Sequence, residues 1–196
     1  MESIQLSRTI RDLSGDPLVR SLPRITWLDR DLPHINGHIL LAPLGAGGMG
    51  AVYYGYSPPL QREVAIKLLP FHAATNPSHV ERFLREGRAA ARIDSDHLVK
   101  VLELSEADGV HYMVMEYVHG GSAQDLLKKI QQEEIEALDE SQLLDLIGAA
   151  TEGMAAAHEA GVIHRDIKPA NIFIPKDAEG YLELDKAKLG DLGLAG

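Results

Sequence analysis

The sequence contains no cysteine among its 196 residues. Disulfide bridges and thiolate metal sites are therefore excluded, and a reducing cytoplasmic location is expected. No run of 18 apolar residues occurs, so no membrane-spanning segment is expected within the chain. The first 20 residues mix charges throughout and have no apolar signal core, which argues against secretion.

Positive charge is also scarce. Lys and Arg number 19 against 29 Asp and Glu, so the formal net charge is -10. This balance argues against nucleic acid or an anionic membrane as the main partner, and any polyanion would need a local group of cations. With 45% hydrophobic and 24% charged residues, the chain has an ordinary globular composition and enough length for one domain or two small lobes.

Several common catalytic motifs are missing as well. The chain has no Gly-Lys-Ser or Gly-Lys-Thr, no His-Glu-x-x-His and no Gly-x-Ser-x-Gly. These absences argue against a P-loop, a zinc protease helix and a nucleophile elbow. His34 and His38 are four residues apart, but Pro33 and Gly37 argue against a helix that would pair them on a metal.

The first half of the chain reads as a polar lead-in followed by strands. Residues 1–35 are interrupted by Pro17, Pro23 and Pro33, and only partial order is expected there. Apolar and β-branched residues then predict strands, with Ala107-Asp108-Gly109 as a hairpin turn before the last of them. The predicted strands are residues 38–45, 51–56, 62–69, 97–104 and 110–118, and one helix is predicted over residues 76–91.

The second half is mainly helical. Helices are predicted over residues 122–132 and 141–159, the latter with Leu143, Leu144, Ile147, Ala150 and Met154 on one face, before short strands at 171–174 and 187–191. The predicted class is α+β, with two lobes that meet at a hinge near residues 116–121. A five-stranded antiparallel lobe with one main helix occupies residues 36–118, and the first part of a helical lobe occupies residues 119–196.

Three glycines form a possible phosphate-binding loop. Gly45, Gly47 and Gly50 fit the pattern G-x-G-x-x-G, although a glycine-rich hairpin without a ligand would look the same. The loop opens into a strand, whereas a dinucleotide-binding loop opens into a helix. Lys67, in Val-Ala-Ile-Lys on the next strand, could add a point charge beside phosphates, unless it is simply an exposed strand lysine.

A cation on the buried side of a sheet needs a carboxylate partner. Glu86, near the middle of the predicted helix over residues 76–91, is the preferred candidate, and Glu81 is the alternative on spacing alone.

The most specific signal is His-Arg-Asp-Ile-Lys-Pro-Ala-Asn at residues 164–171. Asp166 can accept a proton from a hydroxyl group, and Lys168 can neutralise charge on a transferred phosphoryl group. Asn171 offers a neutral oxygen to Mg²⁺, and Asp191, at the end of the last predicted strand, can bridge a metal to phosphates. The spacing therefore indicates phosphoryl transfer.

Together these motifs resemble the protein kinase family in order and spacing, from about residue 38 to the end of the chain. The segments LGAGGMGAVY, REVAIKLL, HYMVMEYVHGGS and HRDIKPANIFI look most like the bacterial kinases of eukaryotic type, and Lys168 is the mark of the serine/threonine branch. The resemblance implies a two-lobed kinase fold and a non-specific serine/threonine protein kinase. It also implies ATP and Mg²⁺ as cofactors and a protein substrate that carries Ser or Thr.

The resemblance also assigns roles to single residues. Asp166, Lys168, Lys67 and Glu86 would be catalytic, and Asn171 and Asp191 would bind Mg²⁺. ATP would be bound by the loop of Leu44, Gly45, Ala46, Gly47, Gly48, Met49 and Gly50, by an adenine pocket of Val52, Ala65 and Phe173, by the gatekeeper Met115 and by hinge residues Glu116 and Val118. His164 and Leu192 would pack in the supporting core.

Two features depart from the family pattern. Leu192 stands where the family usually has Phe, and the sequence ends five residues after Asp191, before an activation loop or an Ala-Pro-Glu segment. The second departure implies a truncated chain in which apolar faces of the helix over residues 141–159 stay exposed. The alternative to an active kinase is therefore an inactive nucleotide-binding or interaction fragment.

Overall fold

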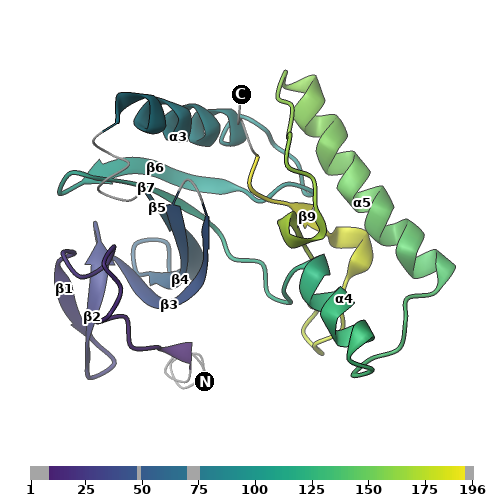
Figure 1. Ribbon diagram of the computed structural model, residues 1–196, viewed down its shortest axis with the longest axis horizontal. Helices are drawn as coiled ribbons and strands as arrows, with labels where there is room; N and C mark the ends of the chain where they lie inside the picture. The colour runs from purple at the N-terminus through teal and green to yellow at the C-terminus, as the bar shows by residue number, and fades with distance from the viewer. Residues whose placement is uncertain (1–8, 48–49, 70–75, 193–196) are drawn as a thin grey trace. The chain divides into compact units, whose positions relative to one another are not determined.

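The computed structural model describes residues 9–47, 50–69 and 76–192 (Figure 1). Contacts between residues divide the chain into two compact units. The strand unit comprises Met1–Leu84 and Val101–Tyr117, and the helical unit comprises Arg85–Lys100 and Val118–Gly196.

A seven-stranded antiparallel sheet forms the strand unit, in the order β1-β2-β3-β4-β5-β7-β6. Its strands are β1 (Arg24–Trp27), β2 (Arg30–Ile35), β3 (His38–Gly47), β4 (Gly50–Ser57), β5 (Arg62–Leu68), β6 (Val101–Ala107) and β7 (Val110–Glu116). The five predicted strands are β3 to β7, which confirms them. The turn between β6 and β7 has Asp108 and Gly109 at φ of 52° and 75°, as a tight hairpin requires.

The expectation of five strands and a partly ordered lead-in was wrong for β1 and β2. These two strands form a hairpin within the segment expected to be a lead-in (Figure 1). Its turn places Leu28 and Asp29 at φ of 49° and 57°, in the left-handed region that usually favours Gly or Asn. A turn made by such residues carries no Asn-Gly signal, so the sequence pattern missed the hairpin.

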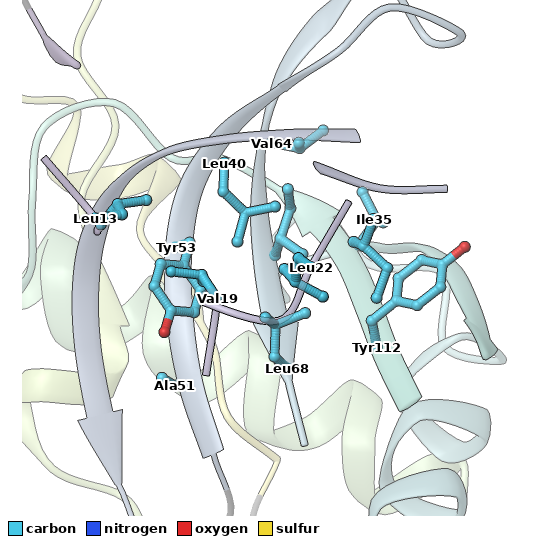
Figure 2. Packing of buried hydrophobic residues seen from close by; sticks show 12 residues of the cluster. Leu13, Val19, Leu22, Ile35, Leu40, Ala51, Tyr53, Val64, Leu68 and Tyr112 are labelled. Atoms are coloured by element: carbon cyan, nitrogen blue, oxygen red, sulfur yellow. The ribbon is translucent and has the colours of Figure 1, made fainter. Parts of the chain in front are cut away.

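The sheet has two differently used faces. Tyr53 pairs with Ile66 in register, and both belong to a buried cluster with Leu40 and Val64 on what we call the Tyr53 face. Figure 2 shows this packing, with Leu13, Val19 and Leu22 of the N-terminal segment beside residues of the sheet. Successive strand residues point to opposite faces, so the neighbours of Tyr53 and Ile66 lie on the other side.

The opposite face, which we call the Lys67 face, contains two rows of paired residues. Val52 pairs with Lys67, which pairs in turn with Met113, and Ala65 pairs with Met115 in the next row. Directly opposed residues in antiparallel strands have Cβ atoms about 4.5–5.5 Å apart, so each row forms a set of neighbouring side chains.

Helix α3 (Pro77–Ala90) packs on part of this face, which confirms the predicted helix. The fully buried Phe83 packs with Met113 and Leu69 in one cluster. Pro77 stands at the first helical position, where its missing N–H is not needed, and the side chain of Asn76 accepts a hydrogen bond from the Ser78 N–H at 3.0 Å.

The helical unit contains two capped helices and a small sheet. Its elements are α4 (Ala123–Gln131), α5 (Glu140–Glu159), the 3₁₀ turns η1 (Pro169–Asn171) and η2 (Leu184–Lys186), and the paired strands β8 (Ile172–Phe173) and β9 (Lys188–Leu189). Ser122 caps α4 in a capping box with Asp125, and Asp139 caps α5 with Gln142. These caps satisfy backbone N–H groups that have no partner within a helix.

The apolar face predicted for α5 is buried only in part: Ala150 and Met154 pack against a buried cluster, and the rest of the face is exposed, as expected for this helix. Leu146, Ala149, Gly153 and Ala157 are buried, whereas Leu143, Leu144 and Ile147 are exposed. Small residues of α5 face inward because the backbone at His97 lies close to the helix there. A Cβ on Gly153 would lie 2.4 Å from the carbonyl oxygen of His97. Hydrophobic periodicity alone does not detect such a close approach.

The strand predicted from residue 97 begins later, at Val101, as β6. Residues before it bond to β9 instead, because the N–H of Val99 donates to the Leu189 carbonyl and the N–H of Leu189 donates to the His97 carbonyl. This short ladder, at 2.8 and 2.9 Å, ties residues 97–99 to the strand that precedes Asp191.

Candidate active site

The loop at residues 164–171 connects α5 to β8 and is organised around the carboxylate of Asp166. The Lys168 ammonium donates to Asp166 Oδ2 at 2.7 Å. The side-chain amide of Asn171 donates to the same oxygen at 3.0 Å and to the Asp166 carbonyl at 2.8 Å. The three polar residues singled out in this loop therefore converge within hydrogen-bonding distance.

Asp166 stays ionised in this setting. The hydrogen bond from Lys168 comes first among the causes that hold the pKa of Asp166 below its ordinary value of 3.8, and Asn171 acts in the same direction. Its side chain is half exposed, so a substrate group can reach the carboxylate. A carboxylate that is deprotonated and accessible at neutral pH can accept a proton.

His164 fixes the start of the loop from inside the unit. The side chain is buried, with Nε2 at 3.0 Å from the Gly190 carbonyl and Nδ1 at 3.4 Å from the backbone N–H of Asp166. Since a carbonyl can only accept, Nε2 carries the proton and Nδ1 accepts from Asp166. Leu192, predicted with His164 to pack in the core, is buried as well.

Two loop residues adopt unusual backbone angles. Arg165 has φ of 61° and Asp191 has φ of 51°, the left-handed region that non-glycine residues rarely occupy. Such conformations cost about 1–3 kcal/mol and persist only where the surroundings hold them. Here Arg165 directly precedes Asp166, and Asp191 is itself a predicted metal ligand.

Gly190 is a site residue that the sequence reasoning missed. Its carbonyl accepts from His164, and its N–H donates to the Asn171 carbonyl at 2.9 Å, so it holds both ends of the loop. A Cβ at this position would lie 2.6 Å from the ring of Phe173. The signal that could have found it is a glycine at a strand end, directly before Asp191.

In the strand unit, the predicted phosphate loop is the hairpin between β3 and β4. Gly45 pairs with Val52, Ala46 with Ala51 and Gly47 with Gly50, so the ladder runs to the described end of the hairpin. The Leu44 side chain is 47% exposed. The predicted ligands Gly48 and Met49 lie outside the described residues.

Behind the hairpin, the predicted nucleotide residues share the Lys67 face. Val52 and Lys67 are direct cross-strand neighbours, as are Ala65 and Met115. Ala65 is buried, and Val52, Lys67 and Met115 are half-buried. The chain then leaves the sheet through Glu116, at the end of β7.

The two candidate partners of Lys67 differ in burial. Glu86 is 5% exposed, whereas Glu81 is exposed. Burial favours Glu86, since a buried carboxylate needs a charge or hydrogen-bond partner. Lys67 belongs to the strand unit and Glu86 to the helical unit, so their pairing stays a prediction.

Comparison with known proteins identifies the family of this chain. A family model described as the protein kinase domain matches residues 39–196. The chain belongs to the protein kinase family. Its fold is kinase-like, with an antiparallel sheet and helix in the N-lobe and part of a C-lobe.

Bacterial kinases are among the relatives of this kinase chain. The serine/threonine-protein kinase pkn2 of Myxococcus xanthus is 38% identical over 156 residues, which cover 80% of this chain and 18% of that protein. PrkC of Bacillus subtilis is 33% identical over 156 residues, with 80% and 22% coverage. The chain thus spans about a fifth of the length of these two relatives.

Solved structures agree with the kinase assignment. The crystal structure of the Mycobacterium tuberculosis PknI kinase domain has a TM-score of 0.64 at 28% sequence identity, and the match covers 83% of this chain and 62% of that one. Within the described part of this kinase chain, no helix is long and apolar enough to cross a membrane.

Proposed function

We propose that this chain carries the ATP-binding and catalytic-loop parts of a serine/threonine protein kinase. The reaction is transfer of the ATP γ-phosphoryl group to a Ser or Thr hydroxyl of a protein. The observation that carries the proposal is the arrangement of Lys168 and Asn171 around the accessible, ionised carboxylate of Asp166.

In this proposal Asp166 accepts the hydroxyl proton as the oxygen attacks phosphorus. Lys168 lies 2.7 Å from that carboxylate, close enough to place its charge beside the transferred phosphoryl group. Phosphoryl transfer needs positioning and charge neutralisation more than covalent chemistry. The bonds from His164 to Gly190 and to Asp166 supply that positioning, because they fix the loop before the substrate arrives.

The strand unit binds the nucleotide in this scheme. Residues 36–118 act as the N-lobe and residues 119–196 as part of the C-lobe.

The hairpin glycines Gly45, Gly47 and Gly50 offer backbone N–H groups to phosphates, and Lys67 holds the α- and β-phosphates with Glu86 as its partner. Val52, Ala65 and Phe173 enclose the adenine, Met115 is the gatekeeper, and the backbone at Glu116 and Val118 forms the hinge. The pairing of Val52 with Lys67 and of Ala65 with Met115 supports a common nucleotide face.

The residues present fit a magnesium ion. The Asn171 amide nitrogen already bonds twice to Asp166, so its oxygen is the ligand that this side chain can offer, and Asp191 supplies a carboxylate. Oxygen ligands of this kind suit Mg²⁺, which would neutralise phosphate charge when bound. The left-handed backbone at Asp191 is consistent with a residue held for function.

A phosphate-transfer assay tests the proposal. Transfer from γ-labelled ATP to a general Ser/Thr protein substrate is compared between the wild-type chain and Asp166→Asn. Loss of a general base lowers the rate by about 10²–10⁴-fold, while affinity for Mg-ATP stays unchanged. Asp145→Asn, an exposed carboxylate on α5, serves as the matched control.

A second measurement separates the inactive-fragment alternative. Thermal stabilisation by Mg-ATP that disappears in Lys67→Met would support an intact nucleotide site. If the wild-type chain binds Mg-ATP but transfers no more phosphate than Asp166→Asn, the chain is a nucleotide-binding fragment and the proposed transfer is wrong for it.

A further inference from the structure

The segment before β1 packs on the Tyr53 face of the sheet, although the kinase family match begins only at residue 39. Leu13, Val19 and Leu22 are 7%, 1% and 5% exposed and belong to the same buried cluster as Tyr53. In Figure 2 they lie against the side chains of the sheet. Ile10 belongs to a second buried cluster, with Leu41 and Tyr54, so the segment Ile10–Leu22 is part of the core of the strand unit.

Two polar ties join this segment to the sheet. The Tyr53 hydroxyl donates to Asp16 Oδ2 at 2.7 Å, and the backbone N–H of Arg11 donates to the Leu41 carbonyl at 2.8 Å. Burial, followed by the neighbouring Asp16, raises the pKa of Tyr53, so its hydroxyl stays a donor throughout the neutral range.

Asp16 is itself held firmly by its own turn. Its N–H donates to the Leu13 carbonyl at 3.0 Å, and its other carboxylate oxygen, Oδ1, accepts from the Leu18 N–H at 2.9 Å. One oxygen thus fixes the segment and the other fixes Tyr53. A carboxylate with both oxygens bonded in this way cannot swing without breaking the turn.

Both ties reach β3 and β4 next to the glycine hairpin, which continues the ladder between these two strands. Tyr53 directly follows Val52 on β4 and pairs with Pro43 on β3. Leu41 precedes Leu44 by three positions on β3. Beyond these points the β3 side of the hairpin is open, since Gly45 and Ala46 are exposed, whereas Gly50 and Ala51 on β4 are buried.

We propose that Asp16 is a positioning residue for the glycine hairpin, because its bond to Tyr53 restrains both strands from the face opposite the nucleotide. Its effect on ATP binding rests on the function proposed above. The effect on the hairpin itself does not, because the Asp16–Tyr53 bond lies entirely in the strand unit.

Amide hydrogen exchange in Asp16→Ala tests the proposal without any ligand. Loss of a hydrogen bond to a charged group should speed exchange about tenfold at the hairpin amides, Leu44–Gly47 and Gly50–Tyr53. Amides of β6 and β7 should stay within about twofold of the wild type. Asp12→Ala is the matched control, because exposed Asp12 accepts a hydrogen bond from the Ser14 N–H within its own turn, and it should leave the hairpin unchanged.

A double-mutant cycle and nucleotide binding complete the experiment. Tyr53→Phe should reproduce the change, and the double variant should add little to either single one. The dissociation constant for Mg-ATP should rise by up to about tenfold in both single variants.

Exchange that is unchanged, or that rises equally in every strand, overturns the proposal, since Asp16 would then be at most a general stabilising residue. Faster hairpin exchange with an unchanged Mg-ATP dissociation constant overturns its effect on ATP. Faster hairpin exchange in a chain whose wild type does not bind Mg-ATP supports the restraint of the hairpin and rejects the proposed nucleotide site.

Discussion

The catalytic loop, residues 164–171, and the glycine hairpin between β3 and β4 are held in different ways. In the proposed reaction the first supplies the base and the second binds the phosphates. In the catalytic loop, side chains bond to one another and to the backbone, with the buried His164 and Gly190 at its base. In the hairpin, the described contacts are mainly the backbone ladder from Gly45–Val52 to Gly47–Gly50.

This difference matches what each part has to do. The base and the metal ligands must already stand in position, because charge that develops during transfer is stabilised best by groups that do not reorganise. A phosphate loop only has to bring backbone N–H groups near the ligand, and glycine allows that close approach. Side-chain bonds therefore concentrate in the loop to which the proposed chemistry is assigned.

The largest effect on stability is expected from His164→Leu. The change removes the partner of the Gly190 carbonyl and of the Asp166 N–H. We expect the free energy of unfolding to fall by about 2–4 kcal/mol, because buried polar groups lose their partners. Transfer should fall by about 10²-fold at a temperature where the variant is folded, since Asp166 loses its restraint.

Chemical denaturation and the transfer assay measure both effects. His158→Leu, at the exposed end of α5, is the matched control and should change neither quantity appreciably. A fully active His164→Leu chain would show that the loop does not depend on this histidine.

A pair of glycine substitutions compares the two regions directly. In Gly190→Ala the new Cβ would lie 2.6 Å from the Phe173 ring and 3.2 Å from a methyl group of Val99, so a loss of about 1–3 kcal/mol is expected. In Gly45→Ala the Cβ meets nothing within 4 Å, and stability should change by no more than about 0.5 kcal/mol.

Thermal or denaturant unfolding of the two variants provides the measurement. Equal losses would contradict the contrast between a tightly packed catalytic loop and an open hairpin.

A smaller effect than that of His164→Leu is expected at Glu103, which joins β6 to β3 and β7 within the strand unit. It accepts hydrogen bonds from Tyr112 and from buried His38, whose other ring nitrogen lies 2.9 Å from the Ser57 hydroxyl. Partial burial by itself raises the pKa of Glu103, but the bonds from Tyr112 and His38 outweigh it and leave the pKa below the ordinary value of 4.5.

A carboxylate with a lowered folded-state pKa stabilises the protein above its unfolded-state value and loses that stabilisation as the pH falls. Glu103→Gln should therefore be less stable than the wild type by about 1 kcal/mol at neutral pH. The difference should shrink as the pH drops from 4.5 through the lower folded pKa. Denaturant unfolding at pH 7 and pH 4 checks this, with exposed Glu81→Gln as the control. A difference that does not depend on pH would contradict the prediction.

The sequence predicted elements best where residues typical of turns or helix starts marked their ends. Asp108-Gly109 marked a hairpin, and Asn76-Pro77 marked the start of α3. The convergence of Asp166, Lys168 and Asn171 could be predicted because short loops keep such residues within reach of one another. By contrast, the β1–β2 hairpin has no glycine in its turn, and its left-handed residues Leu28 and Asp29 gave no local signal.

The sequence by itself determined the family motifs, the five strands β3 to β7 and the chemistry available in the catalytic loop, because these depend on residue type and short-range spacing. Only the tertiary structure decided which face of α5 is buried, that Gly190 fastens the loop, that Leu13 packs in the core of the strand unit, and that Asp16 bonds to Tyr53. Those features depend on contacts between residues far apart in the chain, where close backbone approach and burial outweigh local pattern.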